Sequence, residues 1–168
     1  MQSIFRPEQH DLLDTGSFDE FAGQSFTLPS RWYYDSGIFA LEHERIFYRN
    51  WIYQCHVTDL PNPGDYHVGQ VADQSIIVMR GQDGLIRGFY NVCSHRAHPL
   101  LEGSGNVRVI VCPYHQWCYE PDGCFKGARG REELKDWIPD HADLKQVSLE
   151  DYGGAFVCQS QSGCDTTD

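Results

Sequence analysis

The 168-residue sequence predicts an all-β domain, an antiparallel β-sandwich or barrel that follows an N-terminal arm and one helix. Short runs rich in β-branched and aromatic residues recur from the first third of the chain to its end. Gly-rich turns separate these runs, a pattern typical of antiparallel sandwiches and barrels. We expect strands at residues 51–56, 65–71, 75–80, 85–92, 107–111, 117–120 and 155–158.

The first thirty residues are polar and interrupted by glycine and proline, which predicts an arm rather than a packed element. Asp35 or Ser36 can then cap a helix, because apolar residues follow with a helical period to about Arg49. The sequence therefore predicts three parts, which are an arm and helix (1–50), the main domain (51–158) and a flexible tail (159–168).

Three turn signals divide the predicted strands, at residues 81–84, 103–106 and 121–123. Residues 126–146 are charged and sparsely apolar, so we expect an excursion from the domain with one short helix.

Charge and hydropathy exclude several classes of protein. Thirteen basic against twenty-four acidic side chains give a formal charge of −11, which argues against a nucleic-acid partner. No stretch approaches the roughly 18 apolar residues of a membrane span. The first residues have no basic cluster followed by an apolar segment, so a cytoplasmic location is expected. The seven cysteines are then expected to be thiols or metal ligands rather than disulfides.

Two short segments pair a cysteine with a histidine. Cys93 and His95 stand two positions apart, and Cys112 and His115 stand three apart. Sixteen residues, with a turn and a predicted strand, separate His95 from Cys112. We therefore expect two loops at one end of neighbouring strands that face each other.

Two metal centres suit these four side chains. Two cysteines and two histidines form an ordinary tetrahedral zinc site. They also suit a [2Fe–2S] cluster in which two imidazoles replace the thiolates on one iron. Zinc fingers usually pair cysteine with cysteine and histidine with histidine, whereas each half here is mixed and follows a β run. The spacing favours iron and sulfur over zinc.

Residues 93–96 and 112–117 resemble the Rieske motif of ring-hydroxylating (Rieske non-haem iron) oxygenase large subunits. This family includes aromatic-ring dioxygenases and choline or carnitine monooxygenase-like proteins. The resemblance covers most of the chain from about Leu28 to Gly127, including the predicted helix. It implies a Rieske-type sandwich or barrel with a small cluster-binding subdomain of two loops. It also implies that the ligands of a Rieske [2Fe–2S] cluster are Cys93, His95, Cys112 and His115.

The sequence departs from the family at two positions beside the motif. The family usually has glycine after the first His-Arg and again after the second histidine, where Ala97 and Gln116 stand here. Glycine at such positions lets a loop turn tightly, so the tight turn is not assured at these two positions. Trp117 is expected either to shield the cluster or to serve as an ordinary core aromatic, and Tyr114 is a candidate hydrogen-bond donor to a cluster sulfur.

The resemblance implies one-electron transfer, with a reductase or ferredoxin as donor and a ring-shaped homo-oligomer as the assembly. In this family a second domain holds a mononuclear iron in a two-histidine, one-carboxylate triad. His141 is the last histidine here, so we expect no catalytic residues and no mononuclear iron domain in this chain.

We interpret the chain as the N-terminal Rieske portion of an oxygenase alpha subunit. The alternative is a freestanding Rieske ferredoxin or redox sensor, although such ferredoxins generally lack the arm and helix. A zinc-stabilised binding module is a third hypothesis. His98 and Tyr114 stand where respiratory Rieske proteins have two further cysteines, so a negative midpoint potential is expected.

Overall fold

The computed structural model describes residues 27–130 and 141–159 of the chain. Most of the predicted arm and tail, and the centre of the predicted excursion with its short helix, lie outside the described residues. The chain divides into two compact units, Met1–Ile46 and Phe47–Asp168. Within the described ranges, no helix combines the length and the apolar character that crossing a bilayer requires.

The predicted helix begins where its cap was expected. After a 3₁₀ turn, η1 (Ser30–Tyr33), the α-helix α2 runs over Ser36–Glu42. The Asp35 carboxylate accepts hydrogen bonds from the backbone N–H groups of Gly37 and Ile38, at 2.7 and 3.2 Å. The regular helix ends earlier than predicted, because its last part, η2 (His43–Phe47), is a wider π-helical turn.

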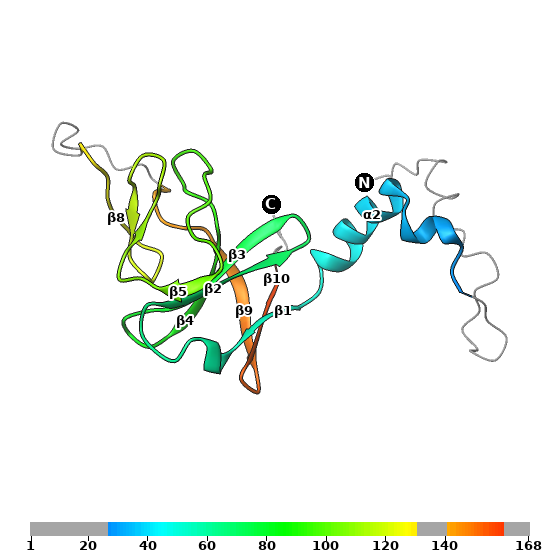
Figure 1. Ribbon diagram of the computed structural model, residues 1–168, viewed down its shortest axis with the longest axis horizontal. Helices are drawn as coiled ribbons and strands as arrows, with labels where there is room; N and C mark the ends of the chain where they lie inside the picture. The colour runs from blue at the N-terminus through cyan, green and yellow to red at the C-terminus, as the bar shows by residue number, and fades with distance from the viewer. Residues whose placement is uncertain (1–26, 131–140, 160–168) are drawn as a thin grey trace, which may run out of the picture. The chain divides into compact units, whose positions relative to one another are not determined.

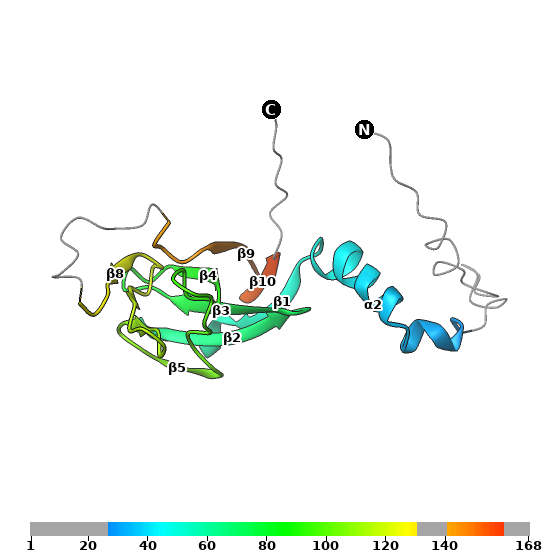
Figure 2. The same ribbon diagram turned by 90° about the horizontal axis from the view of Figure 1, so that it is seen from above.

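All strands of the second unit pair antiparallel, which confirms the predicted fold class. A curled seven-stranded sheet has the order β1-β10-β9-β4-β3-β2-β5, and a small three-stranded sheet has the order β6-β7-β8 (Figures 1 and 2). A short 3₁₀ turn, η3 (Val57–Asp59), follows β1. The strands are β1 (Ile52–His56), β2 (Asp65–Val71), β3 (Gln74–Arg80), β4 (Ile86–Tyr90), β5 (Ser104–Asn106), β6 (Ile110–Val111), β7 (Cys118–Tyr119), β8 (Phe125–Gly127), β9 (Gln146–Tyr152) and β10 (Ala155–Gln159).

Three strands depart from the sequence prediction. β5 occupies part of the predicted turn at 103–106, because this short exposed segment pairs with β2 at the sheet edge. β8 and β9 lie at the two ends of the predicted excursion. The turn between β9 and β10 is made by Gly153 and Gly154, both with positive φ, a common hairpin signal.

The strand β3 separates two hydrophobic cores. Its side chains alternate, so Ile77 and Met79 join one core while Ile76 and Val78 join the other. The second core packs β1 and β10 against β3. The first core contains Cys93, Cys112, Trp117 and Tyr119, so the two Cys-His segments pack against one face of β3.

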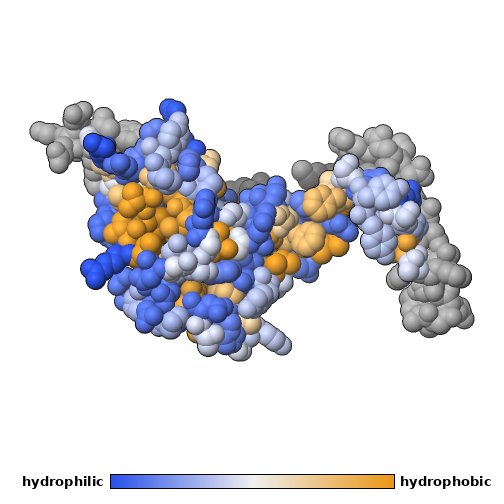
Figure 3. Space-filling model, viewed as in Figure 1, coloured by the Kyte–Doolittle hydropathy of each residue, from blue (hydrophilic) through white to orange (hydrophobic). Residues whose placement is uncertain are grey.

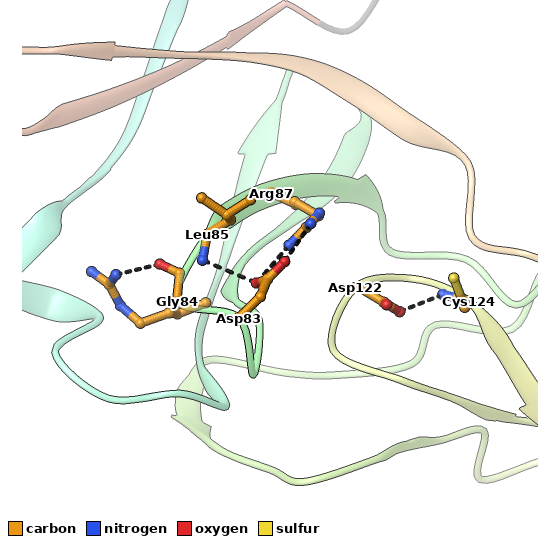
Figure 4. A network of polar contacts seen from close by, with 7 residues as sticks. Asp83, Gly84, Leu85, Arg87, Asp122 and Cys124 are labelled. Atoms are coloured by element: carbon orange, nitrogen blue, oxygen red, sulfur yellow. Dashed lines mark hydrogen bonds and ion pairs between the residues drawn. The ribbon is translucent and has the colours of Figure 1, made fainter.

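The hairpin between β3 and β4 is closed by polar contacts (Figure 4). Asp83 accepts a hydrogen bond from the backbone N–H of Leu85 and forms a bidentate ion pair with Arg87, at 2.7 and 3.0 Å. The Arg87 guanidinium lowers the pKa of the Asp83 carboxyl to about 2. Arg80 donates to the carbonyl oxygen of Gly84 from the same hairpin.

Candidate iron–sulfur site

The first Cys-His loop begins directly after β4 and is closed at its base by a buried amide. Asn91 Oδ1 accepts hydrogen bonds from the backbone N–H groups of Leu100 and Leu101, at 2.9 and 3.0 Å. Its Nδ2 group donates to the carbonyl oxygen of Leu101 and to Ser75 Oγ. Asn91 therefore joins the two ends of the loop and ties them to β3.

The two loops share one backbone frame. In the first loop Ala97 N–H donates to Cys93 O at 2.8 Å, and Cys93 N–H donates to His98 O at 2.9 Å. In the second loop Gln116 N–H donates to Cys112 O at 3.0 Å, and Cys112 N–H donates to Trp117 O at 2.8 Å.

Both loops therefore close over the same number of residues, although their histidines stand at different positions. The residues that close them, Ala97 and Gln116, have φ of 51° and 58°. This left-handed region favours glycine. The tight turns thus persist at the two positions where the sequence departs from the glycines of the family.

The two thiols lie together inside the first core. Cys93 is 3% exposed and Cys112 is fully buried, and the neighbouring Cys112 thiol contributes to the raised pKa of the Cys93 thiol. Tyr119 Oη lies 3.1 Å from Cys93 Sγ and accepts a hydrogen bond from Ser94 N–H at 3.1 Å. Burial raises the pKa of the Cys93 thiol, and burial also raises the pKa of Tyr119, which keeps the phenol protonated.

The two imidazoles form a second pair. The ring centroids of His95 and His115 lie 4.7 Å apart, with the planes at 71°. The His95 ring stacks on Trp117 at 4.9 Å and 6°, whereas His115 is exposed and lies against Tyr114. Burial, followed by the neighbouring His115, lowers the pKa of His95, so this imidazole is neutral at neutral pH. Among the described residues, none offers a hydrogen-bond partner to the buried His95 Nδ1.

The four side chains fit a two-iron cluster. In the part of the chain that the structure describes, no three His, Cys, Asp or Glu side chains gather as ligands of one ion. The site instead has one pair of thiols and one pair of imidazoles, with an unpartnered nitrogen facing inward. A cluster with sulfur ligands on one iron and nitrogen ligands on the other needs this separation into pairs.

The loops face each other as predicted, but they do not follow neighbouring strands of one sheet. The first loop leaves β4 of the large sheet, and the second lies between β6 and β7 of the small sheet. The sequence analysis did not predict that the loops follow strands of two different sheets, because the local sequence does not show which strands pair with each other. In Figure 1 both loops project from the same side of the second unit, near β8.

Tyr119 is the site residue that the sequence analysis did not identify. Its hydroxyl contacts the Cys93 sulfur, whereas Tyr114, the expected donor, is 56% exposed. The signal was present in the sequence, since Trp117 and Tyr119 are alternate residues of a predicted strand, and alternate residues of a strand share a face. Trp117 is confirmed as a core aromatic, because this ring is buried in the first core. The ring also stacks on His95, and its shielding of the cluster stays a prediction.

Comparison with known proteins agrees with this geometry. The model of the Rieske [2Fe-2S] domain family matches residues 50–138. The carnitine monooxygenase oxygenase subunit of Escherichia coli (strain K12) is 41% identical over 132 residues, which are 78% of this chain and 35% of that protein. The chain thus spans about a third of the length of this relative.

Solved structures show the same fold. One is the structure of a quaternary ammonium Rieske monooxygenase that gave insights into carnitine oxidation by gut microbiota and into inter-subunit electron transfer. Its TM-score is 0.73 at 35% identity, and the match covers 80% of this chain and 37% of that one. Naphthalene 1,2-dioxygenase from Rhodococcus sp. has a TM-score of 0.76 and 28% identity, covering 83% of this chain and 33% of that one. The chain belongs to the Rieske [2Fe–2S] domain family and carries a Rieske-type [2Fe–2S] cluster.

Proposed function

We propose that this chain is the electron-transfer module of a Rieske non-haem iron oxygenase. The observation that carries the proposal is the pairing of one half-buried and one exposed imidazole, 4.7 Å apart, beside two buried thiols. When bound, a cluster of this type supplies one-electron oxidation and reduction, at a potential that imidazole ligation raises.

The proposed ligands are Cys93 and Cys112 for one iron and His95 and His115 for the other. Burial of both thiols in the first core supports this assignment, because it excludes water from the sulfur side. His95 Nδ1 supports it as well, since it has no partner among the residues that the structure describes, and a buried polar atom without a partner is costly unless something binds it.

Side chains around the ligands have distinct roles in this proposal. Tyr119 directs its hydroxyl at Cys93 Sγ and holds the Ser94 amide, so it orients the first loop. Trp117 covers the face of His95 and keeps water from it. His115 is exposed, so a redox partner comes closest to the cluster at the imidazole edge of this residue.

We further propose that the chain forms the Rieske portion of an oxygenase alpha subunit. Its similarity to a carnitine monooxygenase subunit and to a quaternary ammonium Rieske monooxygenase supports a parent oxygenase that acts on such cations. A reductase or ferredoxin would donate electrons, and a non-haem iron domain in a homo-oligomer would accept them. We place this assembly in the cytoplasm, with residues 51–158 as the Rieske domain. The sequence that follows Asp168 in the gene distinguishes this proposal from a freestanding Rieske ferredoxin.

A redox titration of the purified holoprotein tests electron transfer. We expect a single one-electron wave with a negative midpoint potential at neutral pH. The potential should fall as pH rises into the range where the imidazoles bound to ferric iron lose protons. A potential well above zero, or one that does not change with pH up to strongly alkaline conditions, would contradict the proposal.

A further inference from the structure

Two contacts join the first cluster loop to a segment almost fifty residues further along the chain. Ser94, which stands between Cys93 and His95, donates its hydroxyl to the backbone carbonyl oxygen of Asp143 at 2.8 Å. The Asp143 carboxylate in turn accepts a hydrogen bond from the backbone N–H of Phe125 at 2.6 Å. Asp143 is thus bonded to the first loop through its backbone and to β8 through its side chain.

The segment around Asp143 is itself firmly held. Ala142 and Leu144, on either side of it, are each 5% exposed and belong to the core that contains Cys93 and Cys112. Leu144 N–H donates to Gly123 O at 2.9 Å, and Tyr90 N–H donates to Lys145 O at 3.0 Å. Movement of Asp143 is therefore restricted by β4 on one side and by the β7–β8 turn on the other.

The two hydrogen bonds of Asp143 reach opposite ends of a row of three packed rings, which are Phe125, Trp117 and His95. Phe125 packs on Trp117 at 4.7 Å, and Trp117 stacks on His95 at 4.9 Å. Ser94 is the chain neighbour of His95 and fixes the backbone from which that imidazole extends. A shift of Asp143 would therefore act on His95 both through its backbone and through the ring that covers it.

We propose that Ser94 and Asp143 form a bridge that positions His95, by joining the first cluster loop to β8. Asp143 is a positioning residue here, because it acts on His95 through Ser94 and Phe125. This inference rests on the proposed assignment of His95 as a ligand. The two hydrogen bonds lie in series between the loop and the strand, so breaking either one opens the whole bridge.

The test uses the holoprotein, four substitutions in the bridge and one control substitution elsewhere. Ser94→Ala removes the hydroxyl donor and Asp143→Ala removes the carboxylate acceptor, whereas Ser94→Thr and Asp143→Asn keep a group that can make each bond. Asp151→Ala is the matched control, because Asp151 accepts from Gly154 N–H at the same distance of 2.6 Å but in the β9–β10 turn. The readouts are the rate of iron release to a chelator and the g-values of the dithionite-reduced protein in electron paramagnetic resonance.

We expect Ser94→Ala and Asp143→Ala each to release iron roughly five-fold faster, the factor for one ordinary hydrogen bond of about 1 kcal/mol. Each should also shift the g-values, because the orientation of the His95 ring changes. The double variant should release iron no faster than the faster single variant. Ser94→Thr, Asp143→Asn and Asp151→Ala should resemble the unaltered protein.

Three results would overturn the bridge. These are unchanged g-values and iron release in both alanine variants, rates that multiply in the double variant, and equal effects of Asp151→Ala. Amide hydrogen exchange of residues 93–98 in the apoprotein gives a readout that does not depend on iron, and faster exchange is expected in both alanine variants. Failure of the proposed function is recognised separately, since the unaltered protein would then lack a Rieske spectrum.

Discussion

The two cluster loops have the same backbone frame but differ in the contacts that they make with the rest of the domain. The first loop is fixed near its tip, where Ser94 bonds Tyr119 and Asp143 and where His95 stacks on Trp117. In the second loop, residues 113–116 are exposed, and within the described part of the chain their hydrogen bonds stay inside the loop and its strand. Among the described residues, the same frame is thus also fixed by hydrogen bonds to distant segments in the first loop, but only by bonds within the loop and its strand in the second.

This difference indicates a division of roles between the two histidines. A half-buried imidazole that stacks on Trp117 and has a lowered pKa is suited to hold a metal and to exclude water. An exposed imidazole is suited to approach a partner, because electron transfer weakens steeply with distance. Figure 3 shows apolar side chains gathered on the side of the second unit that carries β8 and the neighbouring loops. Apolar surface of this kind often marks an interaction site.

The largest expected effect is the loss of the cluster when a thiol is replaced. Cys112→Ser should reduce iron and acid-labile sulfide to background, because a hydroxyl is a poor substitute for a thiolate ligand. Cys158→Ser is the matched control, since Cys158 is equally buried but belongs to the other core. Equal iron and sulfide contents in the two variants would remove Cys112 from the ligand set.

The next effect concerns Trp117, which joins the two loops. Trp117→Ala should lower the free energy of unfolding by about 3–5 kcal/mol, because it removes a large buried ring. Trp51→Ala, at a site that is 45% exposed, should stay within about 1 kcal/mol. Urea unfolding of the holoproteins measures both, and similar losses would show that the covering of His95 contributes little.

A smaller effect separates the two tyrosines. Tyr119→Phe removes the hydroxyl beside Cys93 Sγ, and a hydrogen bond to sulfur stabilises the more negative, reduced state. The midpoint potential should therefore fall by roughly 40 mV, the equivalent of about 1 kcal/mol for one electron. Tyr114→Phe, at the exposed loop, should leave the potential unchanged. A larger shift in Tyr114→Phe would favour the expectation from the sequence over the observed contact.

The smallest effect concerns the left-handed residues that close the loops. Ala97→Gly and Gln116→Gly should each stabilise the protein by at most about 1 kcal/mol, because relief of backbone strain exceeds the added chain entropy only slightly. Ala155→Gly, in β10 without positive φ, should destabilise it by about 0.5–1 kcal/mol. Opposite signs in urea unfolding are the expected result. Destabilisation in all three variants would show that the turns are unstrained.

The sequence predicts the fold class and most strands because short apolar runs rich in β-branched residues, such as 75–80, are bounded by glycine-rich turns. It does not predict β5 or β9, since Ser104–Asn106 is short and polar and β9 is largely exposed. Those strands form through pairing with partners far along the chain, which local pattern does not reveal.

The Cys-His spacing predicts the site, but the hydrogen bond between Tyr119 and Cys93 joins residues 26 positions apart. The left-handed turns at Ala97 and Gln116 are likewise imposed by the closing backbone bonds rather than by the residues that stand there.

The central claim is that one cysteine and one histidine from each loop bind the same cluster. Pulsed electron paramagnetic resonance of the dithionite-reduced protein, with nitrogen-15 histidine, measures this most directly by counting the nitrogens bound to iron. Two coupled nitrogens are predicted for the unaltered protein and one each for His95→Cys and His115→Cys, whose potentials should fall toward the all-thiolate range. Two coupled nitrogens in either variant, or none in the unaltered protein, would contradict the account.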